Sequence, residues 1–221
     1  MIELLIADDH PLFREALRSV VARLFPHSTI HEADRIAHLY NLVDEHPDAD
    51  LLLLDLNIPG AIGFSALVHL RATYPSLPIV MITAHEESTY VRRAIEHGAV
   101  GYLPKSIDSQ TLGVALQEIL DGGTWFPDVP DAAPGVSADE KQAAAQLREL
   151  TPQQFRVLQM VSTGQLNKQI AYELKVSEAT IKAHMTAILR KLGASNRTQA
   201  VLIANSLGLH PDEPLTPAEQ T

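Results

Sequence analysis

Leu51-Leu52-Leu53-Leu54-Asp55 is the stretch that decides the fold. A run of four leucines suits a central strand that is buried on both faces, as in parallel sheets. Outward from it, other short apolar runs lie at Glu3–Ala7, Thr29–Ala33, Ile79–Thr83 and Val100–Leu103. The sequence therefore predicts five strands, with Leu51–Leu54 in the interior of the sheet.

Stretches with helical periodicity separate these strands. They cover about Pro11–Phe25, Arg35–Glu45, Phe64–Tyr74, Ser88–His97 and Ser109–Asp121. Asp9, Ser88 and Asp108 are candidate N-caps. Strands that alternate with helices imply parallel pairing, so we expect an α/β domain with a five-stranded doubly wound parallel sheet.

Composition limits the class of protein. The chain has 221 residues, enough for one or two domains, and no cysteine, which excludes disulfides, thiolate metal sites and thiol catalysis. No apolar stretch approaches the roughly 20 residues of a membrane span, and no basic segment precedes the first apolar run. These features predict a soluble, cytoplasmic protein without a membrane partner.

Charge divides the chain more sharply than its total of −10 indicates. Residues 1–150 carry 10 basic and 22 acidic side chains, whereas residues 151–210 carry 7 and 2. An acidic body joined to a basic module predicts two domains, of which the basic one is the candidate for nucleic acid. We expect the acidic domain to mask the basic one until a switch changes their contact.

Proline marks the predicted domain boundary. Three prolines between Phe126 and Gly135 predict an exposed, flexible linker, and Ser137 with Glu140 fits a capping box that opens a helix over 138–149. Four short helices follow at Pro152–Thr163, Asn167–Leu174, Glu178–Leu192 and Asn196–Leu207. The predicted division is a first domain over 1–124, a linker over 125–149, an all-α four-helix domain over 150–208 and a disordered tail over 209–221.

The ends of the predicted strands carry polar side chains. Asp8 and Asp9 come after the first strand, Asp55 after the third, Thr83 closes the fourth, and Lys105 follows the fifth. On a parallel sheet these carboxyl ends converge, so the five side chains should share one cleft. Three neighbouring carboxylates repel one another, and a hard divalent cation such as Mg²⁺ relieves that repulsion. His10 lies next to this cleft and before Pro11; it is interpreted as a helix-entry residue, with a proton-shuttling neighbour as the alternative.

These residues resemble the receiver domain of bacterial two-component response regulators, over about residues 1–121. The resemblance implies a flavodoxin-like fold and a Mg²⁺ site formed by Asp8, Asp9, Asp55 and the backbone carbonyl of Asn57. It also implies that Asp55 accepts a phosphoryl group from a sensor histidine kinase, with Lys105 binding the phosphate.

Two further residues match the switch of that family. After phosphorylation, Thr83 would turn inward to bond the phosphoryl group, and Tyr102 would follow into the vacated space. The switch is thus a change of charge at Asp55 that alters the packing of Thr83 and Tyr102.

Residues 167–192 form a helix-turn-helix candidate with a tight turn at 175–177. An apolar stripe on its second helix packs inward and leaves the opposite face able to enter a major groove. Base contacts are expected from Lys182, Ala183 and Thr186. Phosphate contacts are expected from Lys168, Thr180, His184 and Lys191, and Arg190 lies toward the same open face.

This module resembles the LuxR-type DNA-binding domain over residues 150–208, on motifs that include 167–171 and 196–200. The whole chain therefore resembles the NarL/FixJ class of response regulators. One departure is Gln153-Gln154, which stands where the family has a basic-acidic pair, so an intradomain ion pair should be missing. The apolar face of the last predicted helix should divide between the domain core and a second copy of the chain.

The resemblance implies a transcription regulator in which phosphorylated Asp55 controls binding to double-stranded promoter DNA. It implies a homodimer, RNA polymerase as a candidate partner, and no enzymatic turnover beyond slow autodephosphorylation. One alternative is a phosphorylation-independent regulator whose receiver serves only for dimerisation. Another is an aspartate-dependent phosphohydrolase, against which Asn57 counts because those enzymes carry a carboxylate two residues beyond the nucleophile.

Overall fold

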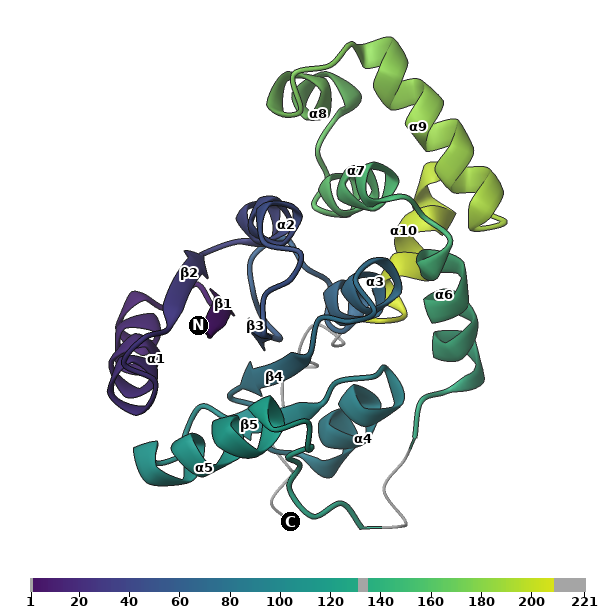
Figure 1. Cartoon of the computed structure of the whole chain (residues 1–221). Coiled ribbons are helices and arrows are strands. Elements are labelled where there is room, and N and C mark those ends of the chain that lie inside the picture. Colours follow the sequence, from purple (N-terminus) through teal and green to yellow (C-terminus); the bar gives the residue numbers. More distant parts are fainter. Residues whose placement is uncertain (1, 131–134, 209–221) are drawn as a thin grey trace, which may run out of the picture.

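The computed structural model describes residues 2–130 and 135–208. The first part of the chain forms a five-stranded sheet in the order β2-β1-β3-β4-β5, with every pairing parallel (Figure 1). The strands are β1 (Glu3–Ala7), β2 (Thr29–Ala33), β3 (Leu51–Asp55), β4 (Ile79–Thr83) and β5 (Gly101–Pro104). The predicted doubly wound α/β fold is confirmed, and the tail over 209–221 lies outside the described residues.

Two helical layers cover the sheet and explain the leucine run. The helices α1 (Pro11–Leu24) and α5 (Ser109–Leu120) cover one face; α2 (Ile36–Glu45), α3 (Ser65–Thr73) and α4 (Ser88–Glu96) lie on the other. Leu51 and Leu53 belong to the core beneath α1 and α5, whereas Leu52 and Leu54 belong to the core beneath α2 and α3. Because successive strand residues point to opposite faces, a strand between two helical layers is apolar throughout.

Helix capping differs from the prediction at two of three helices. Asp108 caps α5 by accepting the backbone N–H groups of Gln110 and Thr111. The N-cap of α1 is His10 rather than Asp9, and the N-cap of α4 is Glu87 rather than Ser88. Pro11 accounts for the first shift, since proline favours the first helical position and places the cap one residue before it.

The second part of the chain is wholly helical. It comprises α6 (Ala138–Arg148), α7 (Pro152–Ser162), α8 (Asn167–Glu173), α9 (Glu178–Lys191) and α10 (Arg197–Asn205). Lys175 adopts a φ of 55° in the turn between α8 and α9, and the Ser177 side chain then caps α9. The four-helix domain with its helix-turn-helix pair is confirmed. Among the described residues, no helix has the length and apolar character needed to cross a bilayer.

The linker helix is docked rather than loose. Ala143, Ala144 and Leu147 of α6 are buried in an apolar core that is continuous with the α2–α3 side of the sheet. The expected capping box is only half formed: Ser137 Oγ accepts the Glu140 N–H. The Glu140 carboxylate instead contacts the receiver, at Arg93 of α4 and at His97, the C-cap of that helix. The helix expected over 138–149 is present as α6 over Ala138–Arg148.

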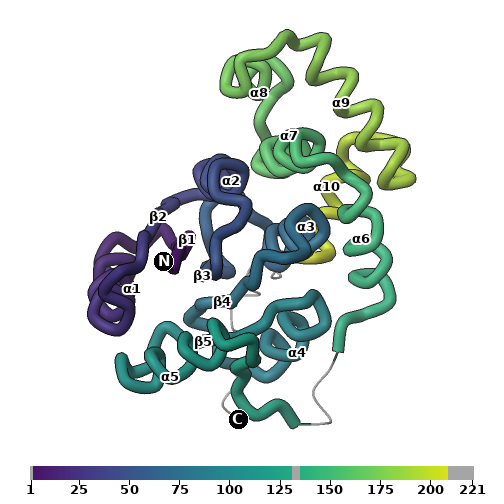
Figure 2. The backbone as a smooth tube through the Cα atoms, viewed as in Figure 1, coloured from purple at the N-terminus to yellow at the C-terminus, as the bar shows by residue number. Residues whose placement is uncertain are grey.

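The helical domain packs on the receiver through α7. The Phe155 ring stacks on His69 of α3 with centroids 4.0 Å apart, and Arg156 Nη2 lies 2.9 Å from Asp44 Oδ2 of α2. The tube in Figure 2 shows α8 and α9 farthest from the sheet. The expected masking of the basic module does not extend to α9, since Lys182 and Thr186 on its outer face are exposed.

Candidate functional site

The carboxyl edge of the sheet brings the predicted acidic residues and Lys105 together. Asp8 and Asp9 follow β1, Asp55 ends β3, and Lys105 follows β5. Lys105 Nζ lies 2.6 Å from Asp8 Oδ2 and 3.0 Å from Asp55 Oδ2. The side chains of Asp8 and Asp55 are each 1% exposed, so this ammonium is their main compensating charge. Parallel topology produces the convergence that the sequence predicted.

Burial and the ion pairs act in opposite directions on the two charged partners. Burial raises the pKa of Asp55, although the hydrogen bond and charge of Lys105 oppose the shift. Burial lowers the pKa of Lys105, but its bonds to Asp8 and Asp55 outweigh this, so that the pKa is raised. The lysine therefore remains a cation, and the buried carboxylates depend on it.

The pocket fits a hard divalent cation. Asp8 Oδ2 and Asp9 Oδ1 are buried, and their close partners are Lys105 Nζ at 2.6 Å and His10 Nδ1 at 2.7 Å. Carboxylate oxygens gathered in this way are the ligands that Mg²⁺ prefers in proteins. Asn57 donates its backbone N–H to Asp55 Oδ1 at 3.3 Å, which places this residue beside the same cluster.

His10 belongs to the pocket, beside which the sequence had placed it as a helix-entry residue. Its Nδ1 lies 2.7 Å from Asp9 Oδ1 and 3.4 Å from Lys105 Nζ. The interpretation as a helix-entry residue is correct as far as it goes, because His10 is the N-cap of α1. Its side chain is 65% exposed, so this member of the cluster is open to solvent. The available signal was its position directly after two carboxylates.

The two expected switch residues meet at His85, in the turn after β4. Thr83 Oγ1 accepts the His85 N–H at 3.2 Å, and the Tyr102 hydroxyl donates to the His85 carbonyl at 2.7 Å. Tyr102 is 1% exposed, so its ring already lies inside rather than waiting at the surface. Burial raises the pKa of Tyr102, so its hydroxyl stays protonated as a donor. No pattern in the sequence indicated His85 as the partner that Thr83 and Tyr102 share.

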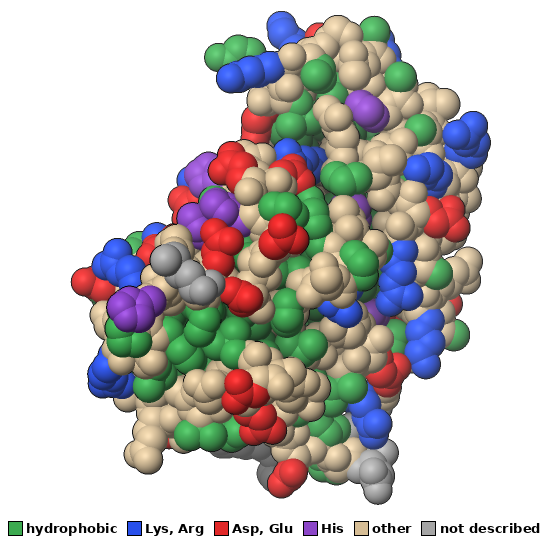
Figure 3. All heavy atoms as spheres, in the orientation of Figure 1, with side chains coloured by type: hydrophobic (Ala, Val, Ile, Leu, Met, Phe, Trp, Pro, Cys, Tyr) green, Lys and Arg blue, Asp and Glu red, His purple; other side chains and the backbone are tan. Residues whose placement is uncertain are grey.

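The outer face of α9 carries the expected base-reading residues. Lys182, Ala183, Thr186 and Arg190 are all exposed, whereas the apolar stripe at Ile181, Met185 and Ile188 is buried. Lys168, at the start of α8, is exposed, and Thr180 and His184 are half-buried. Figure 3 shows Lys and Arg side chains projecting around α8 and α9. This arrangement leaves a polar, partly basic helix face open to solvent.

Lys191 lies apart from that face. Its Nζ donates to the Glu149 carbonyl and to Gln154 Oε1, both at 2.8 Å. The expected phosphate contact would therefore require two intradomain hydrogen bonds to break. The Lys191–Gln154 bond also joins α9 to α7 where an ion pair was expected to be missing, since an amide oxygen replaces the carboxylate as acceptor.

The apolar face predicted for the last helix lies against the core of its own domain. Ala200, Ala204 and Leu207 are buried in the domain, and Val201 and Ile203 are partly buried against it. Leu202, which projects from the other side of the helix, is 63% exposed. One side of α10 therefore seals the core, and an apolar side chain remains outside it.

Comparison with known proteins agrees with this geometry. Residues 4–117 match the response regulator receiver domain, and residues 148–204 match the bacterial regulatory proteins of the LuxR family. The chain belongs to the response regulators that combine a receiver with a LuxR-type helix-turn-helix domain. Its relatives include proteins that regulate transcription.

Two curated relatives span nearly the whole chain. The glycerol metabolism activator of Pseudomonas putida is 40% identical over 215 residues, which are 94% of this chain and 96% of that protein. The nitrate/nitrite response regulator NarL of Escherichia coli K12 is 30% identical over 201 residues, 90% of this chain and 93% of NarL. The two-domain organisation is thus that of the relatives.

A solved structure has the same fold. RcsB of Salmonella enterica serovar Typhimurium, solved on the promoter P1flhDC with a phosphomimetic, aligns with a TM-score of 0.53 and 24% identity. The alignment covers 93% of this chain and 98% of RcsB.

Proposed function

We propose that this chain is a two-component response regulator in which phosphorylation of Asp55 controls the binding of α9 to promoter DNA. The observation that carries the proposal is the 3.0 Å contact between Asp55 Oδ2 and Lys105 Nζ, in a pocket with Asp8 and Asp9. The acting parts are a receiver over 1–124, a connection over 125–149 and a DNA-binding domain over 150–208.

The chemistry is a transfer from a phosphohistidine of a sensor kinase. An oxygen of Asp55 attacks phosphorus, the new P–O bond forms as the P–N bond breaks, and the leaving imidazole keeps the electron pair. Lys105 stabilises the charge on the phosphoryl oxygens. The side chains of Asp8, Asp9 and Asp55 with the Asn57 carbonyl would hold Mg²⁺, which supplies further charge neutralisation. Slow hydrolysis of the acyl phosphate resets the chain, and no other turnover is proposed.

The readout passes through His85. Thr83 Oγ1 now accepts the His85 N–H, and its own proton is the donor that a phosphoryl oxygen needs. When Thr83 turns toward that oxygen, the turn after β4 loses one of its hydrogen bonds. Tyr102, bonded to the His85 carbonyl, and α4 then adjust together.

The output is a DNA-bound homodimer in the cytoplasm. Lys182, Ala183 and Thr186 of α9 read bases in the major groove, and Lys168 binds a phosphate. Exposed Leu202 of α10 faces a second copy. RNA polymerase is the further partner that a promoter-bound regulator would meet.

Intact mass after incubation with acetyl phosphate and Mg²⁺ tests the first step. We expect one phosphoryl adduct that is absent with chelator and absent in Asp55→Asn, and that persists in Asp48→Asn, an exposed control. Affinity for a duplex selected from a random pool then tests the second step and should rise on phosphorylation. An adduct without any change in DNA affinity would favour the phosphorylation-independent regulator, and the absence of an adduct on Asp55 would overturn the proposal.

A further inference from the structure

A second cluster of metal-ligating side chains lies at the opposite edge of the sheet from Asp55. Glu3 begins β1, His31 lies in β2, and His46 is the C-cap of α2. In the parallel register Glu3 pairs with Thr29 and Leu5 pairs with His31, so Glu3 and His31 project from the same face. That face is the one covered by α2, and the end of α2 brings His46 to the other two.

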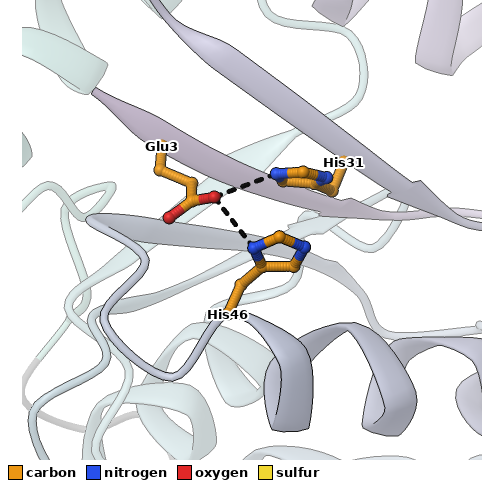
Figure 4. Close-up of side chains that lie close together, drawn as sticks. All are labelled: Glu3, His31 and His46. Carbon is orange, nitrogen blue, oxygen red and sulfur yellow. Dashed lines mark hydrogen bonds and ion pairs between the residues drawn. The ribbon is translucent and has the colours of Figure 1, made fainter. Parts of the chain in front are cut away.

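The three side chains converge on one point. Glu3 Oε1 lies 3.0 Å from His31 Nε2 and 2.9 Å from His46 Nδ1, and the two imidazole rings stack with centroids 3.7 Å apart. Figure 4 shows both ring nitrogens directed at the same carboxylate oxygen. All three ligand atoms lie within 4.8 Å of one another.

This spacing is close to that of a metal centre. A tetrahedral Zn²⁺ with bonds of about 2.0–2.2 Å holds its ligand atoms about 3.3 Å apart. The oxygen–nitrogen distances would have to lengthen by only a few tenths of an ångström. The side chains are 24% exposed for each histidine and 32% for Glu3, so an ion can reach them from solvent.

We propose that Glu3, His31 and His46 form a Zn²⁺ site completed by water. Two imidazoles and a carboxylate suit Zn²⁺ and the other late first-row divalent ions, whereas Mg²⁺ prefers oxygen ligands alone. The site is therefore chemically distinct from the pocket around Asp55, where three of the four clustered side chains are carboxylates. It would tie the end of α2 to the first two strands.

The local field favours a cation there. The last turn of α2 contains no basic residue, and its end carries the partial negative charge of the helix dipole. Glu45, Asp48 and Asp50 adjoin the same segment, and Asp50 Oδ2 accepts the backbone N–H of Glu3 at 2.8 Å. Histidine and acidic side chains also lie side by side on the face drawn in Figure 3. A bound dication would offset this negative potential.

Metal titration of the untagged full-length chain tests the site, with Mg²⁺ saturating the Asp55 pocket. We expect one Zn²⁺ per chain by calorimetry, and Co²⁺ used as a probe should give the visible bands of tetrahedral coordination. His31→Asn and His46→Asn should each weaken Zn²⁺ binding at least about 100-fold, since loss of even an outer partner of a ligand costs 10–100-fold. His27→Asn, an exposed histidine outside both clusters, should bind as the parent does.

A further variant separates this site from the Asp55 pocket, where His10 is the one imidazole in the cluster. His10→Asn should retain Zn²⁺ binding. Loss of binding in His10→Asn with retention in His31→Asn and His46→Asn would overturn the proposal, as would the absence of any stoichiometric Zn²⁺ binding. If a variant does not fold, Co²⁺-induced paramagnetic shifts of the His31 and His46 ring protons in the parent chain decide the question, and unshifted protons would refute the site.

Discussion

Arg93 of α4 and Glu140 of α6 form an ion pair, Nε to Oε1 at 2.8 Å, between the receiver and the helix that leads to the DNA-binding domain. His97 Nε2 lies 2.7 Å from the same Glu140 oxygen. Arg93 Nη2 also donates to the carbonyls of Leu207 and Gly208, just after α10. One side chain of α4 thus contacts both the beginning and the end of the helical part.

Glu140→Gln should loosen this docking. The carboxylate is 8% exposed, and losing one partner of a buried pair costs about 3–5 kcal/mol, less where the amide keeps one hydrogen bond. We expect a larger radius of gyration by small-angle X-ray scattering, with the receiver still phosphorylated. Glu149→Gln, at the exposed C-cap of α6, is the matched control. Identical scattering from both variants would refute a docking role.

Docking should weaken in acid. Burial, aided by Arg156, lowers the pKa of His69 to about 4, so His69 is neutral when stacked on Phe155. An undocked His69 takes a proton near pH 6.5, so docking loses about 1.4 kcal/mol per pH unit as the pH falls from about 6.5 toward 4.

Glu140 acts in the same direction at lower pH. Burial raises its pKa, but the bonds to His97 and Arg93 outweigh this and leave the pKa lowered. The docking free energy that the Glu140 carboxylate contributes is therefore fully present above the usual glutamate pKa. It is lost as the pH falls through the lowered pKa that Glu140 has in the docked structure. Small-angle scattering across pH 7 to 4 measures the loss of docking caused by both residues. His69→Phe should remove the loss of docking that occurs above pH 4.5. A pH profile unchanged in His69→Phe would contradict the assignment.

Lys105→Met should separate metal binding from phosphorylation. The ammonium lies 2.6 Å from Asp8 Oδ2, so its removal relieves competition with Mg²⁺ and should leave Mg²⁺ affinity equal or higher. The phosphoryl oxygens lose their cationic partner, so the rate from acetyl phosphate should fall about 10²–10³-fold. Calorimetry and timed intact-mass measurements check the two parts. A phosphorylation rate equal to that of the parent would contradict the role of Lys105 in stabilising the phosphoryl oxygens.

Tyr102→Phe should uncouple the readout from the chemistry. It leaves the carbonyl of the half-buried His85 without its 2.7 Å donor, at a cost of about 1 kcal/mol. The phosphoryl adduct should form at the parent's rate, because Tyr102 does not contact Asp55 in the described structure. The gain in DNA affinity on phosphorylation should shrink. An unchanged gain would show that the hydroxyl has no part in the switch.

Lysine variants should distinguish base reading from phosphate binding. Lys182→Ala on α9 should cost about 1–3 kcal/mol on the selected duplex and relax its preference at one base pair. Lys168→Ala should weaken binding to all duplexes alike. It should also reduce the steepness with which log K falls with log salt concentration by about 1. Lys141→Ala on α6 is the control. Equal losses on selected and scrambled duplexes for Lys182→Ala would place that residue on a phosphate instead.

The sequence by itself determined the receiver fold and the main residues of its pocket. The periods of strands and helices are local properties of the chain. The side chains of Leu51–Leu54 alternate between the two faces of the sheet, so all four are buried only if helices cover both faces. Once five strands run parallel, Asp8, Asp55 and Lys105 must meet, because their strands end at one edge. The exposed face of α9 could be predicted as well, because it lies opposite the apolar stripe that packs inward.

Only the tertiary structure decided which segments dock on one another. Glu140 fits a capping box by local pattern, yet its carboxylate bonds Arg93 of another helix 47 positions away. Lys191, His85 and the Glu3–His31–His46 cluster likewise take partners set by how helices and loops pack. Local periodicity specifies which face of an element is apolar, but the partner of a polar side chain depends on the competing groups that folding brings within reach.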